Sequence, residues 1–260
     1  MKIIGRRDFL RRLGNSAAVA FSGSIIGILW QGNANADEPK IQIKHEVSSK
    51  GRTFDPQNPP AEKPANEDAF TLCEITCKFS FQHQYRMRRS EGFCAVEVTI
   101  KSVTIDMNLA IKIWMPNEPS AQAPAEEKLA WRVLLRHENG HSLICRRLFD
   151  AIAEKLAHEQ FRVPPGFSFI LPPNDCKDET AKKESAERVS DLLRGFCDKT
   201  SEAVEAELKK AADTYDLATA HGTAGSGPGG GSEPATKENQ TRAAEKVVAD
   251  AVAAFNTAHH

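Results

Sequence analysis

Two histidines and a glutamate at positions 137–141 are the residues of this chain most typical of a metal-binding or catalytic site. His137, Glu138 and His141 form an H-E-x-x-H pentad, which is completed by Asn139 and Gly140. On a helix, residues four apart lie one turn above each other, so the two histidines present imidazole nitrogens to the same point. Such a pair binds Zn²⁺ at about 2.0–2.1 Å, and the neighbouring carboxylate can take a proton from water at the metal. The spacing therefore predicts half of a catalytic zinc site, with Glu138 as its base.

The pentad lies in a long segment with helical periodicity. Residues 125–159 contain no proline, and their apolar side chains recur three or four positions apart, at Trp131, Leu134, Leu135, Ile144, Leu148 and Ile152. Pro124 marks the predicted start of the helix, and Pro164 and Pro165 follow its predicted end. Gly140 is the one poor helix former inside, and a glycine beside a metal ligand lets another segment approach closely. We therefore expect one long helix that carries both histidines.

A catalytic zinc needs three protein ligands, and the pentad supplies only two. The continuation typical of metzincins is missing, because Ile144 and Arg147 stand where that class has glycine and histidine. Elimination among the other histidines favours His221, which precedes Gly222 in a predicted turn after a second helical stretch. Three carboxylates remain open as alternative ligands: Glu184, Glu187 and Asp216.

Tyr215 stands close to the proposed third ligand and is one of two tyrosines in the chain. Zinc peptidases need a donor that stabilises the oxyanion formed when water attacks a carbonyl, so Tyr215 is a predicted catalytic residue. A buried anchor for the helix end is the alternative role of this side chain. Asp216, if it is not a ligand, could orient a ligating imidazole by accepting a hydrogen bond from the ring nitrogen that does not bind the metal.

The first 36 residues have the composition of an export signal. Residues 5–11 resemble the twin-arginine motif, an apolar stretch follows at 17–30, and small residues typical of a cleavage site stand at 34–36. The apolar stretch is shorter than the ~20 residues of a membrane span, which favours cleavage over an uncleaved anchor. The sequence thus predicts a periplasmic or secreted protein that begins at Asp37 and has no stable association with the membrane.

The net charge of the chain bears on its partners. The chain has 34 basic and 35 acidic residues, and losing the five basic residues and one acidic residue of the leader changes its net charge from −1 to −5. This mildly acidic balance gives no electrostatic reason to expect nucleic acid as a partner.

Six cysteines in an oxidising compartment predict disulfide bonds. Cys73 and Cys77 would lie about 13 Å apart on a strand, so each is expected to pair elsewhere.

Alternating apolar residues predict strands before the long helix. The alternation runs through 73–85 and 94–100 and continues through 103–113 on the opposite parity, so Lys101 and Ser102 mark a bulge or a turn. Helical periodicity returns at about 179–214. These elements predict an α+β fold in which a small antiparallel sheet packs on the H-E-x-x-H helix and a second helix, as in zincins.

Composition divides the chain into five parts. The signal peptide at 1–36 is followed by an extended, proline-rich arm at 37–68 with a short strand at 41–47. The zincin-like domain is expected at 69–222 and includes a proline-rich loop at 163–175. A Gly/Ser/Pro linker at 223–235 precedes a last helix at 236–260.

Several of these features together resemble the bacterial family of predicted secreted zinc-dependent proteases. They are the arm, the paired strands with a cysteine at the start of the second, Trp131 six residues before the pentad, and Tyr-Asp-x-x-Thr-x-His-Gly at 215–222. The resemblance covers roughly residues 69–222 and implies a metalloprotease fold and a zinc site without specifying a substrate. A metallopeptidase would act on a peptide or protein. A cell-wall peptide amidase and a non-catalytic zinc-binding or scaffold protein share the same residues and remain alternatives.

Overall fold

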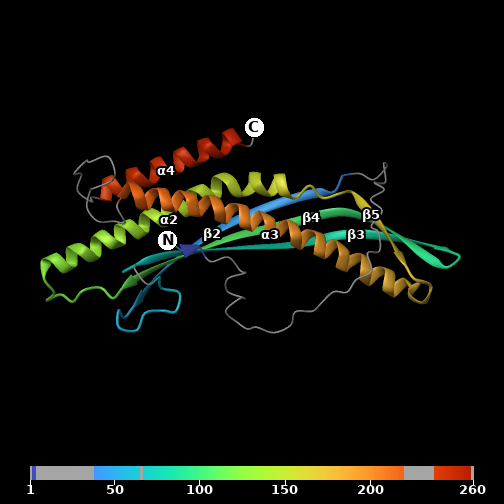
Figure 1. Ribbon diagram of the computed structural model, residues 1–260, viewed down its shortest axis with the longest axis horizontal. Coiled ribbons are helices and arrows are strands. Elements are labelled where there is room, and N and C mark those ends of the chain that lie inside the picture. The colour runs from blue at the N-terminus through green and yellow to red at the C-terminus, as the bar shows by residue number, and fades with distance from the viewer. Residues whose placement is uncertain (1, 4–37, 65–66, 220–236, 259–260) are drawn as a thin grey trace.

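The computed structural model describes residues 2–3, 38–64, 67–219 and 237–258. The sheet contains β2 (Lys40–Phe54), β3 (Phe70–Ser90), β4 (Phe93–Pro116), β5 (Gly166–Leu171) and the two-residue β1 (Lys2–Ile3). The helices are α2 (Ala125–Gln160), α3 (Asp178–Thr219) and α4 (Lys237–Ala258), and one 3₁₀ turn, η1, spans Pro173–Asp175. The fold is α+β, with the long strands first and the long helices after them (Figure 1).

The sheet is mixed, which corrects the predicted antiparallel sheet. β4 pairs antiparallel with β3 and β5, but β2 pairs with β4 in parallel, and β1 pairs with β3 in parallel. β2 lies on the far side of β4 from β3, so the chain crosses the end of the sheet between β2 and β3 instead of forming a hairpin. The predicted short strand at 41–47 is the first half of β2, and the predicted loop at 163–175 contains β5.

The long β3–β4 hairpin contains the predicted irregularity. Its turn includes Gly92, whose φ of 85° suits glycine better than other residues. Gln82 pairs with Ser102 and His83 with Ile100, which leaves Lys101 as an extra residue in β4. The prediction of a bulge at this position is confirmed. The bulge explains the change of parity, because it keeps the apolar side chains of both halves of β4 on the buried face.

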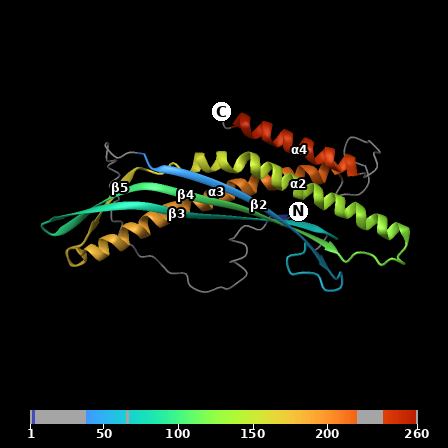
Figure 2. The same cartoon turned by 180° about the vertical axis from the view of Figure 1, so that it is seen from behind.

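The helices cover one face of the sheet. α2 contacts β2 and β4, α3 contacts β3, and α4 packs on the outer side of α2 and α3, as the two opposite views show (Figures 1 and 2). The core lies between the helices and the alternating inward residues of β4, among them Ile105, Met107 and Leu109. Ile144, Leu148 and other apolar residues of α2 fill it from the helix side. No helix within the described residues is long and apolar enough to cross a membrane.

Two disulfides connect the sheet to the elements that follow it. Cys73 of β3 is bonded to Cys145 of α2, and Cys94 of β4 is bonded to Cys176, which follows η1. The prediction that Cys73 pairs with a cysteine other than Cys77 is confirmed. The same prediction for Cys77 is not borne out, because Cys77 and Cys197 are not bonded in this structure.

Candidate metal centre

Helix α2 places the side chains of the pentad in the interior of the protein. The helix begins at Ala125 and ends at Gln160, within one residue of the predicted range. His137 is 5% exposed, Glu138 4% and His141 1%. The Nε2 atoms of the two histidines lie 3.1 Å apart, as expected for imidazoles one helical turn apart that face the same point. The three pentad side chains are close enough together to share one metal ion.

Asp216 of α3 brings a carboxylate oxygen to the same point. Its Oδ1 atom lies 3.1 Å from His137 Nε2 and 2.7 Å from His141 Nε2. Ligand atoms on a tetrahedral zinc with bonds of 2.0–2.1 Å are roughly 3.4 Å apart. The two nitrogens and the oxygen therefore form a triangle only slightly smaller than one face of such a tetrahedron. His137, His141 and Asp216 fit a cation held above this triangle.

The carboxyl of Asp216 is held in its ionised form. Burial alone would raise its pKa, but hydrogen bonding to His137 and His141 outweighs the burial and holds the pKa well below its usual range. A buried, ionised carboxylate beside two imidazole nitrogens is a hard oxygen donor of the kind that completes sets of histidine ligands on zinc.

Thr219, one turn after Tyr215 on α3, orients the ring of His137. Its hydroxyl donates a hydrogen bond to the carbonyl of Tyr215 at 2.8 Å. Because that proton is used, the Thr219 oxygen accepts at its other contact, with His137 Nδ1 at 3.3 Å. Nδ1 therefore carries a proton, and the lone pair of Nε2 would become available to a metal ion once that nitrogen gives up the proton that it donates to Asp216. Nδ1 of His141 has no such partner within the described part of the chain.

Tyr215 packs against both histidines. Its ring stacks on His137 with centroids 5.1 Å apart and meets the ring of His141 edge-on at 5.0 Å. The side chain is fully buried, and its hydroxyl has no hydrogen-bond partner among the residues that the structure describes. That hydroxyl lies against Gly140, where a Cβ atom would come within 2.9 Å of the ring atom Cε1 and still closer to Cζ and the hydroxyl. Gly140 thus provides the close approach expected beside a metal ligand.

Replacing Gly140 with alanine is expected to lower the free energy of unfolding by about 2 kcal/mol or more, because the methyl group would overlap a rigid, buried ring. Gly195 offers a matched control, since it lies in α3 and a Cβ atom added there would have nothing within 4 Å. Gly195→Ala should raise stability by up to about 1 kcal/mol through helix propensity alone. Chemical denaturation of both variants checks the pair, and a neutral or stabilising Gly140→Ala would contradict the packing described here.

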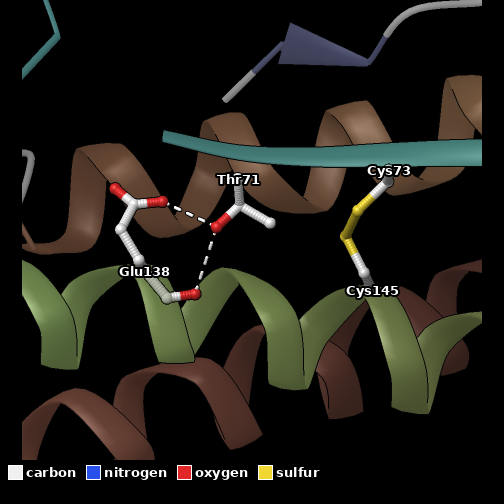
Figure 3. Close-up of a disulfide and its surroundings, with 4 residues drawn as sticks. All are labelled: Thr71, Cys73, Glu138 and Cys145. Atoms are coloured by element: carbon white, nitrogen blue, oxygen red, sulfur yellow. Dashed lines mark hydrogen bonds between the residues drawn. A yellow bond between two sulfur atoms is a disulfide. The ribbon is translucent and has the colours of Figure 1, made fainter. Parts of the chain in front are cut away.

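Thr71 of β3 holds the glutamate of the pentad. Its hydroxyl lies 2.6 Å from Glu138 Oε2 and 3.3 Å from the backbone carbonyl oxygen of Glu138 (Figure 3). The hydroxyl has one proton, and it donates that proton to the nearer, charged oxygen Oε2. Burial raises the pKa of Glu138 above its ordinary value, against lowering contributions from His141, the Thr71 hydrogen bond and His137. The Cys73–Cys145 disulfide lies beside this contact and joins the same strand to the same helix (Figure 3).

The structure brings together some of the predicted site residues and separates others. Tyr215 and Asp216 lie at the pentad, but they belong to the last turns of α3 and not to a turn after it. Glu184 and Glu187 pair with Arg188 and Lys183 near the start of α3. Glu187 is about 43 Å of helical rise away from Asp216, so neither glutamate reaches the centre.

Three predicted features lie outside the described residues: His221, the twin-arginine segment with its cleavage site, and the Gly/Ser/Pro linker at 223–235. Thr71 and Thr219, which contact the pentad, were not predicted. Thr219 could have been found from its spacing, because it stands four residues after Tyr215 and residues four apart lie on the same face of a helix.

Comparisons with protein-family models, with curated proteins and with solved structures find no match for this chain.

Proposed function

We propose that this protein is an exported zinc-dependent metallopeptidase with His137, His141 and Asp216 as its protein ligands. The convergence of two imidazole nitrogens and one carboxylate oxygen within 2.7–3.1 Å carries this proposal. Three protein ligands leave one tetrahedral position for water or substrate, which is the composition of a catalytic zinc site. Glu138 stands next to the ligands in the chain, its carboxylate is held by Thr71, and a carboxylate oxygen lies within 4.8 Å of the histidine nitrogens.

A bound zinc supplies Lewis acidity, which polarises a substrate carbonyl and makes a coordinated water easier to deprotonate. Glu138 would accept a proton from the attacking water and pass it to the leaving amine. Thr71 donates to Oε2 of Glu138, which leaves Oε1 to receive the proton. Thr219 holds His137 with Nε2 toward Asp216 and His141, and the ring of Tyr215 keeps both imidazoles in place. The hydroxyl of Tyr215 is the proposed donor to the oxyanion.

The disulfides support the proposed location. Cystines persist in oxidising compartments and are rare in the cytosol, so Cys73–Cys145 and Cys94–Cys176 agree with export to the periplasm or the medium. The proposed signal at 1–36 supplies the route. The partner of the mature protein is then a peptide or protein substrate in that compartment.

A non-catalytic zinc protein is the second candidate, and the burial of the centre favours it. In the part of the chain that the structure describes, all three proposed ligands and Glu138 are at most 6% exposed. A structural zinc is closed by four protein ligands, whereas a catalytic zinc keeps an open position. The two candidates therefore differ in whether a substrate can reach the metal.

Metal analysis followed by a cleavage assay tests the proposed function. Mature protein purified without chelator is expected to contain about one zinc per chain, because a three-ligand site binds the metal stoichiometrically. It should cleave members of a library that contains both ordinary peptides and cell-wall stem peptides, and a chelator should stop the cleavage. Preference for stem peptides would identify the amidase. A zinc-loaded protein that cleaves nothing in the library supports the non-catalytic alternative, and a metal-free protein ends both.

A further inference from the structure

Two cysteines remain outside the disulfides, and their thiols lie next to each other. Cys77 is on β3, and Cys197 is on α3 with 4% of its surface exposed. The two side chains are close enough for Cys197 to shift the pKa of Cys77. The other four cysteines of the chain are already paired with each other. Cys77 and Cys197 are therefore the one remaining pair.

The alignment of α3 along β3 places these two residues opposite each other independently of that shift. His83 of β3 meets Ser185 of α3, with Nε2 and Oγ 3.1 Å apart. From His83 back to Cys77 the strand advances about 20 Å. From Ser185 forward to Cys197 the helix advances about 18 Å. Because the two elements run side by side in both ribbon views, equal advances from a shared contact bring Cys197 to the level of Cys77 (Figures 1 and 2).

The surroundings of this pair favour a structural bond over a reactive thiol or a metal site. The neighbouring Cys197 thiol, followed by burial, raises the pKa of the Cys77 thiol far above its usual range, so the thiolate is scarce in the folded protein. A redox sensor needs the opposite, an exposed thiol with a low pKa. Two thiols supply only two of the three or four ligands that a zinc site needs, and within the described residues neither cysteine belongs to a group of three or more side chains that could share a metal.

We propose that Cys77 and Cys197 form a third disulfide, which joins β3 to α3 in the exported protein. The oxidant is a disulfide donor of the export compartment. The small thiolate fraction of Cys77, which is the partly exposed cysteine of the pair, attacks a donor sulfur, which forms a mixed disulfide and releases one donor thiol. The second cysteine then attacks the protein sulfur of that mixed disulfide, which forms the S–S bond and releases the second donor thiol. Two electrons and the two protons of the protein thiols end on the donor.

This bond would complete the attachment of both ligand-bearing helices to one strand. Cys73–Cys145 already joins β3 to α2, four residues beyond His141. Cys77–Cys197 would join the same strand to α3, the helix that carries Asp216. A metal centre assembled from two helices is then fixed through a common strand. The disulfide itself is inferred from the cysteine geometry and holds whether or not the centre is catalytic.

Peptide mapping of the mature protein tests the inference. The protein is exported in its own host, alkylated in denaturant without reductant, and cut after glutamate, lysine and arginine. Cleavage after Glu74 separates Cys73 from Cys77, so Cys77 is released in residues 75–78 and Cys197 in residues 195–199. We expect these two peptides to be joined, with a mass lower by two hydrogen atoms than the sum of the free thiol forms. Alkylated Cys77 and Cys197, or either one joined to a different cysteine, would overturn the proposal.

Counting free thiols in denaturant supplies a second measurement. The wild-type protein is expected to show none, and Cys77→Ala should show one, at Cys197. Loss of the bond should also lower the melting temperature of the oxidised protein by roughly 5–10 °C. If Cys77→Ala shows no additional thiol relative to wild type, the pair is not bonded. The wild-type map decides the question even where the variant does not fold.

Discussion

Replacing Glu138 with glutamine is expected to leave the zinc content unchanged and to lower peptide hydrolysis by roughly 10²–10⁴-fold. Glutamine has nearly the shape of glutamate, and its amide oxygen can still accept the hydrogen bond from Thr71. The amide cannot accept the proton of water, so the variant removes the base and keeps the rest of the centre. Zinc analysis and the rate of cleavage of one identified substrate, measured on the same preparation, check both halves of this expectation.

Thr71 provides a graded comparison for the same role. Thr71→Ser keeps the hydroxyl that holds Glu138, whereas Thr71→Val keeps the shape and removes the donor. If the hydrogen bond positions the base, the valine variant should lose about tenfold in rate with its zinc retained, and the serine variant should stay close to wild type. Hydrolysis by Glu138→Gln at the wild-type rate would show that Glu138 is not the base, and equal rates for the two threonine variants would remove the positioning role.

The parts of the fold that depend on local pattern could be predicted from the sequence. The three-and-four spacing of apolar residues located α2 to within one residue at its ends, and the change of parity in β4 located the bulge at Lys101. Strand pairing depends on contacts far apart in the chain, so the parallel position of β2 beside β4 had no local signature. β5 was missed because prolines surround it, although Phe167, Phe169 and Leu171 alternate as in a strand.

The centre was predictable where its residues lie on one helix. His137, Glu138 and His141 share a single α-helical segment, and the spacing alone brings them together. The contribution of Asp216 depends on where α3 ends. A helix that ended near residue 214 would put Asp216 in a turn, whereas the observed helix continues to Thr219 and aims Asp216 at α2. Thr71 comes from a strand 67 residues earlier, and its hydrogen bond to Glu138 follows from the register of β3 against α2.

Replacing Asp216 with alanine is expected to weaken zinc binding by roughly 100- to 1000-fold, beyond the 10–100-fold that loss of an outer partner of a ligand usually costs. Its Oδ1 lies within 3.1 Å of both imidazole nitrogens, so alanine removes one of three converging donors. Asp213 of the same helix is the control, because its carboxylate pairs with Lys209 on the surface. Competition with a chelator of known affinity measures both variants, and Asp213→Ala should bind zinc like the wild type. An effect of Asp216→Ala no larger than tenfold would show that Asp216 is not a ligand.

His221→Ala, measured in the same way, separates the two candidate functions. With His137, His141 and Asp216 as the ligands, His221 is not required, and its replacement should leave the affinity within about threefold of wild type. Loss of affinity with His221→Ala but not with Asp216→Ala would restore the histidine as the third ligand. Large losses with both variants would mean four protein ligands, hence a closed site of the structural kind, and the centre would then hold zinc without hydrolysing peptides. The cobalt-substituted protein gives an independent check, because its absorption spectrum reports the number and type of donors in each variant.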